Sequence, residues 1–168
     1  MPTVAFITLG CKVNQFDTQA VREAMARQGL AEVDASQEAD AYVVNTCCVT
    51  RESHRKSLRH LRRLAREHPD AVVVALGCSV DADPSAFEAL GAPCIALGNE
   101  AKARLAETVA EALGHEIEPT EPPAWPTISR FEGHTRAFVK IEDGCDDFCA
   151  YCIVPHVRGR VRSRGRGG

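Results

Sequence analysis

The 168-residue sequence lacks several features that would place it in a broad class of proteins. It has no apolar run of the ~18–20 residues that a membrane-spanning helix needs, so we expect no contact with a membrane. Its start at Met1 has no basic segment followed by a long apolar one, so no secretory signal peptide is predicted. A formal net charge of -3 gives no bulk sign of a nucleic-acid binder. Together these absences predict a cytoplasmic protein.

Aromatic residues are also scarce, at 5% of the chain, so the core must be built mainly from aliphatic side chains. Cysteine, by contrast, is abundant, with eight residues. Thiols are kept reduced in the cytoplasm, which argues against a framework of disulfides. Metal binding is therefore the leading interpretation of the cysteines, and buried unreactive thiols are the alternative.

Short apolar runs and helical patterns alternate along the first two thirds of the chain. This alternation indicates a parallel sheet with helices on both faces, so the predicted fold class is α/β, doubly wound. The predicted strands cover residues 3–9, 41–45, 71–76 and 95–97, and the predicted helices cover residues 14–28, 51–67, 84–90 and 99–113.

Prolines crowd into residues 116–130, which we interpret as a stiff, extended linker. The linker divides the chain into an α/β domain at residues 1–115 and the start of a second domain at residues 131–168. Residues 136–141 are predicted to form the first strand of the second domain. Because the second domain is too short to bury a core of its own, we expect the chain to be an incomplete fragment.

Three cysteines, Cys11, Cys47 and Cys78, each come directly after a predicted parallel strand. The carboxyl ends of parallel strands lie along one edge of a sheet, where open α/β sheets usually bind ligands. Gly10 and Gly77 precede two of these cysteines and permit a close approach of the backbone. Three thiolates suit a [4Fe–4S] cluster with one open iron, or zinc with a fourth ligand. The alternative is three unrelated buried cysteines.

Two further cysteines fit this arrangement less well. Cys48 follows its neighbour directly on an extended segment, where adjacent side chains point in opposite directions. Cys94 precedes its predicted strand, so it should lie at the other edge of the sheet. We interpret both as structural thiols.

Cys145, Cys149 and Cys152 form a C-x3-C-x2-C motif within eight residues. This spacing differs from the bacterial ferredoxin run and from the paired knuckles of a zinc ribbon. It can wrap one iron–sulfur cluster and leave one iron free to hold a small molecule, such as S-adenosylmethionine. Tyr151 would pack beside that molecule. A structural zinc site or chance spacing is the alternative.

Four separated motifs together resemble the N-terminal part of the radical S-adenosylmethionine methylthiotransferase family. The order Gly-Cys-Lys-Val-Asn-Gln in the first motif resembles the branch that modifies threonylcarbamoyladenosine in tRNA. The isopentenyladenosine branch and the ribosomal-protein aspartate branch usually carry other residues after that cysteine. The matching segments are Leu9–Gln15, Asn45–Cys47 with Val49–Thr50, Gly77–Cys78, and Lys140–Pro155 with Arg158–Gly159 and Arg162–Arg164.

This resemblance implies two [4Fe–4S] clusters and S-adenosyl-L-methionine as cofactors. The first cluster would carry the sulfur, and the second would cleave S-adenosylmethionine to a radical that abstracts hydrogen at adenine C2. The implied partners are tRNA and an electron donor such as flavodoxin or ferredoxin. The implied ligands are Cys11, Cys47 and Cys78 for the first cluster and Cys145, Cys149 and Cys152 for the second.

The chain departs from the family's pattern in two ways. Ser79-Val80-Asp81 follows the third cysteine, where the family usually has Tyr-Ala-Gln. The rest of a partial TIM-like barrel and an RNA-binding β-domain are missing, so we expect the isolated chain to be catalytically inactive. The arginines spaced along residues 158–166 would then form a frayed tail. We interpret the basic residues of 51–66 as the solvated face of a helix, and a surface for RNA is the alternative.

Rival interpretations remain open. The substrate could be isopentenyladenosine in tRNA or an aspartate of a ribosomal protein. From other classes, the chain could be an iron–sulfur module for electron transfer or cluster delivery, or a nucleic-acid binding module with structural zinc.

Overall fold

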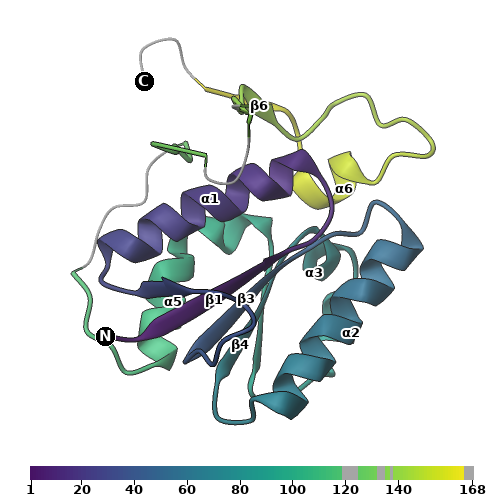
Figure 1. The fold of residues 1–168 in the computed structure, drawn as a ribbon. Coiled ribbons are helices and arrows are strands. Elements are labelled where there is room, and N and C mark those ends of the chain that lie inside the picture. The colour runs from purple at the N-terminus through teal and green to yellow at the C-terminus, as the bar shows by residue number, and fades with distance from the viewer. Residues whose placement is uncertain (119–124, 132–134, 137, 165–168) are drawn as a thin grey trace.

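The structure is a computed structural model, and it describes residues 1–118, 125–131, 135, 136 and 138–164. Its centre is a five-stranded parallel sheet with the strand order β2-β1-β3-β4-β5 (Figure 1). In this order the chain reverses direction across the sheet between β1 and β3, which marks the switch point where such folds bind ligands. The strands are β1 (Thr3–Thr8), β2 (Ala31–Val33), β3 (Ala41–Thr46), β4 (Val72–Gly77) and β5 (Cys94–Leu97).

Helices cover both faces of the sheet, which confirms the doubly wound α/β prediction (Figure 1). One face is covered by α1 (Lys12–Arg27) and α5 (Leu105–Ala112), and the 3₁₀ helix η1 (Asn99–Arg104) leads into α5. The other face is covered by α2 (Arg51–Glu67), α3 (Cys78–Ala82) and α4 (Pro84–Glu88).

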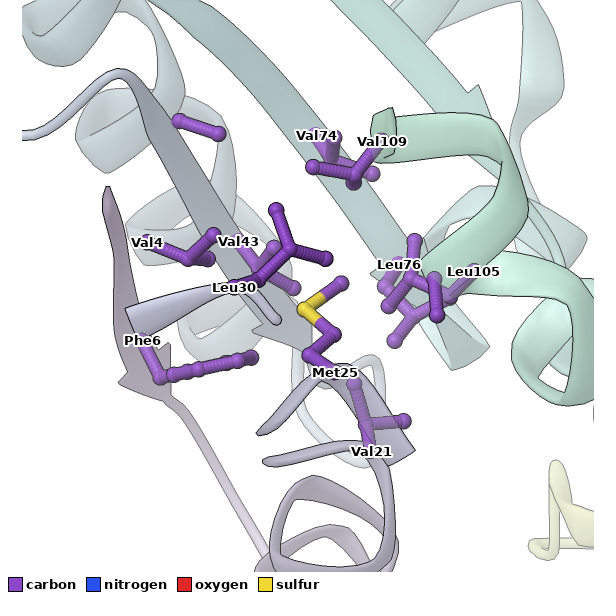
Figure 2. Close-up of a cluster of buried hydrophobic side chains, with 12 residues drawn as sticks. Val4, Phe6, Val21, Met25, Leu30, Val43, Val74, Leu76, Leu105 and Val109 are labelled. Carbon is purple, nitrogen blue, oxygen red and sulfur yellow. The ribbon is translucent and has the colours of Figure 1, made fainter. Parts of the chain in front are cut away.

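Alternating strand residues fill the two layers between sheet and helices. Val43 of β3 faces α1 and α5, whereas its neighbours Tyr42 and Val44 face the α2 side. Figure 2 shows Met25 of α1 in the middle of the first layer, which otherwise consists mainly of Val, Leu and Ala, as the low aromatic content predicts.

Helix α2 has the bounds that its sequence pattern predicts. Thr50 caps its start, because the hydroxyl oxygen accepts a hydrogen bond from the Ser53 amide at 3.0 Å. Leu61 and Leu64 are buried against the sheet, and most of the basic residues of the helix are exposed. No helix in the described ranges is long and apolar enough to cross a bilayer.

The prediction of a strand at residues 136–141 is wrong for the part that the structure describes. Residues 138–141 form no strand, and Ala137 lies outside the described residues. The chain instead forms a two-residue strand, β6 (Glu142–Asp143), which pairs antiparallel with β7 (Arg162–Ser163), and α6 (Val154–Arg158) lies between them. The division into domains at 115 and 130 stays a prediction, and most of the prolines of the linker lie outside the described residues.

Candidate metal centre

The first set of cysteines lies at the carboxyl edge of three adjacent parallel strands. Cys11 follows β1 and comes directly before α1, Cys47 follows β3, and Cys78 follows β4 as the first residue of α3. We call these three residues the sheet-edge trio. β1 and β3 are the two strands on either side of the switch point, so two of the thiols flank the place where this topology binds ligands.

A glycine brings the first two loops of this edge into close contact. Gly10 has φ +93°, and a Cβ at that position would overlap the Cβ and Sγ atoms of Cys47. Cys47 is itself only 3% exposed. Any side chain at position 10 would therefore displace the loop that carries Cys11 from the loop that carries Cys47.

Asn14 ties the ends of β1 and β3 together. Its Nδ2 donates hydrogen bonds to the carbonyl oxygens of Leu9 and Thr46, both at 2.8 Å, and Asn14 is fully buried. The two carbonyls come shortly before Cys11 and Cys47 in the chain. The asparagine of the first motif thus fixes the spacing of two loops of the trio.

A second set of hydrogen bonds connects the third loop. Thr46 Oγ1 donates to the carbonyl oxygen of Leu76 at 2.7 Å and accepts from the Ser79 amide at 3.2 Å. Asn45 Nδ2 donates to the carbonyl oxygen of Asn14 at 3.0 Å. Thr46 therefore holds the β4–α3 turn against β3, and Asn45 holds the first turn of α1 against the same strand.

The fit of a metal group to this edge rests on the chemistry and placement of the donors. All three cysteines are free, and thiolates are the ligands that iron–sulfur clusters and zinc prefer. Two buried polar atoms of the same edge, Asn45 Oδ1 and Ser79 Oγ, have no hydrogen-bond partner within the described residues. However, no three His, Cys, Asp or Glu residues gather closely enough to hold a metal ion in the part of the chain that the structure describes. The trio as a ligand set stays a prediction.

Cys48 and Cys94 occupy different places in the fold. Cys94 opens β5 opposite Val73, at the amino end of the strand and away from the trio. Burial raises the pKa of its thiol to about 11. Burial also raises the pKa of Cys48 to about 12, and the thiols of Cys78 and Cys47 add to this shift. The role of Cys48 as a structural thiol stays a prediction.

The second set of cysteines, which we call the loop trio, consists of Cys145, Cys149 and Cys152. They lie in the loop between β6 and α6, and Cys149 is exposed. The Cys152 amide donates to the carbonyl oxygen of Cys149 at 2.9 Å, which makes a tight turn. Tyr151 is 93% exposed, so in this structure it packs against no neighbouring layer.

The segment that carries the loop trio lies against the carboxyl edge of the sheet, close to α1 and α3 (Figure 1). Arg158 Nη2 donates to Asn14 Oδ1 at 2.8 Å. Asn99 Nδ2 donates to the carbonyl oxygen of Val157 at 2.7 Å and lies 3.5 Å from Cys78 Sγ. Sequence analysis missed Asn99, and it placed Arg158 in a frayed tail, which is wrong because this side chain is buried and paired. Arg166 lies outside the described residues.

A sequence profile described as "Uncharacterized protein family UPF0004" matches residues 3–96. The chain belongs to this family. The matched residues hold β1 to β5 almost completely and the whole sheet-edge trio. The UPF0004 match therefore coincides with the sheet and its carboxyl edge, whereas the loop trio lies beyond it.

Curated relatives extend the similarity beyond the UPF0004 match to nearly the whole chain. A protein of Chlamydia pneumoniae named Threonylcarbamoyladenosine tRNA methylthiotransferase MtaB is 38% identical over 163 residues, which is 96% of this chain and 37% of the relative. The protein of the same name from Bacillus subtilis is 35% identical over 98% of this chain and 38% of its own length. A tRNA-2-methylthio-N(6)-dimethylallyladenosine synthase of Acetivibrio thermocellus is 31% identical over 94% of this chain and 35% of its own length. The chain thus spans little more than a third of these relatives.

Proposed function

We propose that this chain is the N-terminal part of a cytoplasmic methylthiotransferase that modifies threonylcarbamoyladenosine in tRNA. The observation that carries the proposal is that the segment with the loop trio is held against the edge of the sheet that carries the sheet-edge trio. The sheet-edge trio follows three adjacent strands, and the segment with the loop trio is hydrogen-bonded to the same edge through Asn14 and Asn99. The identity of 35–38% to relatives named for this reaction supports the choice of substrate.

In this proposal each trio holds one [4Fe–4S] cluster. Three thiolates leave one iron of a cluster without a protein ligand, and on the loop trio that iron would hold S-adenosyl-L-methionine. When bound, the two clusters would supply radical formation, removal of hydrogen from adenine C2 and the sulfur that replaces it, and a second S-adenosylmethionine would supply the methyl group on that sulfur.

The chain's own residues contribute binding and orientation. Gly10 lets two loops of the sheet-edge trio pass in contact, and Asn14 fixes the strand ends before them. Tyr151, beside the last cysteine of the loop trio, has a fully accessible ring that can stack on a bound S-adenosylmethionine.

Two partners belong to the proposal. The tRNA is the substrate, and an electron donor such as flavodoxin or ferredoxin supplies the electron for radical formation. Helix α2 is the most basic exposed element of the sheet domain, but three of its arginines are paired with Glu52 or Glu67 on the same helix. This pairing favours a solvated face, and we do not assign tRNA binding to α2.

Nucleoside analysis of tRNA tests the proposal. In a strain that lacks the full gene encoding this chain, the 2-methylthio form of threonylcarbamoyladenosine should be absent, and the full gene should restore it. The gene with Cys149→Ala should fail to restore it, whereas Cys94→Ala, at the opposite edge of the sheet, should succeed. Normal levels of this nucleoside in the deletion strain would refute the proposal.

The same experiment separates the rival interpretations. Loss of the methylthio form of isopentenyladenosine would favour the isopentenyladenosine branch. Loss of a modified aspartate in a ribosomal protein of the same strain would favour the ribosomal-protein branch. Metal analysis of the chain after anaerobic reconstitution tests the other classes. Zinc without iron or sulfide would favour a nucleic-acid binding module with structural zinc. Bound clusters whose electron paramagnetic spectrum does not change when S-adenosylmethionine is added would favour electron transfer or cluster delivery.

A further inference from the structure

Five charged side chains meet between the sheet domain and the C-terminal segment, and the proposed function does not use them. Asp17 of α1 lies at the centre: its carboxylate is 2.6 Å from Lys102 Nζ, 2.7 Å from Lys140 Nζ and 3.2 Å from Arg158 Nη2. Asp143 completes the group, at 2.7 Å from Lys140 Nζ and 2.9 Å from Arg158 Nη1. We call these five residues the buried ionic cluster.

The buried ionic cluster joins parts of the chain that are far apart in sequence. Asp17 and Lys102 belong to the sheet domain, on α1 and η1. The other three members belong to the segment that carries the loop trio. The bonds from Asp17 to Lys140 and to Arg158 therefore connect the two halves of the proposed site directly.

Burial makes these charges depend on one another. The side chains of Asp17, Lys140 and Arg158 are 3%, 6% and 6% exposed. Burial alone would raise the pKa of Asp17, but the three cations around it hold this pKa well below its ordinary value, so the carboxylate is charged at neutral pH. Buried ion pairs add little net stability compared with apolar packing, whereas removal of one partner leaves an uncompensated charge. Such a cluster therefore specifies one arrangement of its elements.

On the side of the sheet, this arrangement reaches the loops of the sheet-edge trio. Arg158 Nη2 donates to Asn14 Oδ1 at 2.8 Å as well as to Asp17. Asn14 in turn holds the carbonyls of Leu9 and Thr46, just before the first two cysteines of that trio. One guanidinium thus contacts the carboxylate that fixes the segment and the amide that fixes the strand ends.

On the side of the segment, the same arginine lies next to the loop trio. Arg158 ends α6, and the carbonyl oxygen of the following residue, Gly159, accepts a hydrogen bond from the Cys145 amide at 3.1 Å. The preceding residue, Val157, accepts from Asn99, which also lies beside Cys78. Residues 157–159 are therefore hydrogen-bonded to Cys145 on one side and, on the other, to Asn99 beside Cys78 and to Asn14.

We propose that Asp17, Asn14 and Arg158 are positioning residues that hold the two cysteine loops at a fixed separation and orientation. The meaning of that separation rests on the proposed function, because a sulfur atom held at one trio must meet a substrate radical formed at the other. Reactions between two held groups lose rate steeply when the groups are misplaced by about 1 Å. The buried ionic cluster is suited to prevent that misplacement.

Hydrogen exchange of the metal-free 168-residue chain tests the geometric part of the proposal. Asp17→Asn keeps the shape of the side chain but removes the charge that three cations share. Amides of residues 141–160, among them those of Cys145 and Cys152, should exchange at least roughly tenfold faster, which corresponds to a shift of about 1.4 kcal/mol in local opening. Amides of β3 and β4 should keep the exchange rates of the unmodified chain.

A matched control is Glu52→Gln, which removes an exposed ion pair of 2.7 Å with Arg59 on α2. This variant should leave the exchange of residues 141–160 unchanged. Unchanged exchange of that segment in Asp17→Asn would overturn the proposal, and so would an equal acceleration in the control. If Asp17→Asn also loosens the strands, Arg158→Lys decides the question, because lysine keeps the charge but cannot reach Asp17, Asp143 and Asn14 at once. Selective loosening of the segment in Arg158→Lys supports the proposal, and any other pattern overturns it.

The functional part has its own readout. In the nucleoside assay, Asp17→Asn should lower the methylthio content of tRNA several-fold, while the iron content per chain stays that of the unmodified protein. If the iron content falls together with the methylthio content, the variant has lost cluster binding or folding. That result would overturn the positioning role of Asp17. If no variant, including the intact gene, yields methylthio nucleoside, the proposed function fails, and the exchange experiment still decides whether the two loops are locked together.

Discussion

Replacing Gly10 with alanine would put a methyl group where the Cys47 side chain lies. At φ +93°, an alanine costs roughly 1–2 kcal/mol more than glycine, because its Cβ crowds the backbone. The added Cβ also overlaps Cys47, which is buried and belongs to the packed core on the α2 side of the sheet. Overpacking of this kind typically costs about 1–3 kcal/mol. We therefore expect Gly10→Ala to destabilise the chain by about 2–5 kcal/mol.

Gly114→Ala is the matched control for this prediction. Gly114 also has a positive φ, +63°, but a Cβ there meets no atom within 4 Å. Its replacement should cost only the conformational term of about 1–2 kcal/mol. Because 1 kcal/mol shifts the melting temperature by roughly 2–4 °C in a chain of this size, Gly10→Ala should melt about 2–12 °C below Gly114→Ala.

Thermal unfolding followed by circular dichroism measures this difference, and thiol labelling shows where it arises. Cys47 is buried, so a maleimide should label it slowly in the unmodified chain and in Gly114→Ala. Labelling of Cys47 should become faster in Gly10→Ala, because the side chain is pushed out of its packed position. Equal melting temperatures for the two variants, with unchanged labelling of Cys47, would refute the close packing of these two loops.

Three other predictions follow from the same contacts. Asn14→Ala leaves the buried carbonyls of Leu9 and Thr46 without a donor, so urea unfolding should show a loss of about 2–6 kcal/mol; a loss below ~1 kcal/mol would contradict the bridging role. At pH 8, iodoacetamide should modify exposed Cys149 much faster than Cys94, whose pKa of about 11 keeps it protonated, and equal rates would show that Cys94 is accessible. Because the folded-state pKa of Asp17 is lowered, its contribution to stability is present above its unfolded pKa of about 4 and is lost as the pH falls further, so Asp17→Asn should flatten the acid limb of the stability curve below about pH 4.

The sheet domain could be predicted well from sequence because its signals are local. Each six-residue strand contains a continuous apolar run, and α2 has a capping threonine, a buried leucine stripe and a proline after its end. The elements that were missed are short. β2 has three residues, with a glutamate in the middle, and forms only because the edge of β1 offers a partner. α3 has five residues and begins at Cys78, where the sequence indicates a ligand loop.

The strand predicted at residues 136–141 shows why a period-two pattern is not sufficient. Val139 and Ile141 alternate with polar residues as a half-buried strand would, yet they are 80% and 69% exposed. A strand forms where a second strand pairs with it and a layer covers its apolar face. The only strand that pairs in this region of the described chain is β7, and it lies beside residues 142 and 143 instead.

The place of three cysteines at the strand ends could be predicted from sequence, but the buried charges around them could not. Strand ends place Cys11, Cys47 and Cys78 at one edge by topology alone. The ion pair between Asp17 and Lys140 joins residues 123 positions apart, and no local pattern indicates it. The local sequence around a buried arginine does not differ from that around an exposed one, because burial depends on partners elsewhere in the chain.

The packing of the carboxyl edge bears on the simplest rival interpretation, in which the sheet-edge trio is three unrelated thiols in apolar surroundings. Asn45 Oδ1 and Ser79 Oγ are fully buried there and lack a hydrogen-bond partner within the described ranges. An unsatisfied buried polar group costs about 1–3 kcal/mol, and an apolar core gains nothing from keeping two of them. Gly77 adds to this, because a Cβ at that position would lie 2.8 Å from Asn45 Oδ1, so glycine leaves that oxygen open on one side. These two open polar atoms beside the cysteines favour the proposed cofactor site over three unrelated thiols, whose packing does not require them.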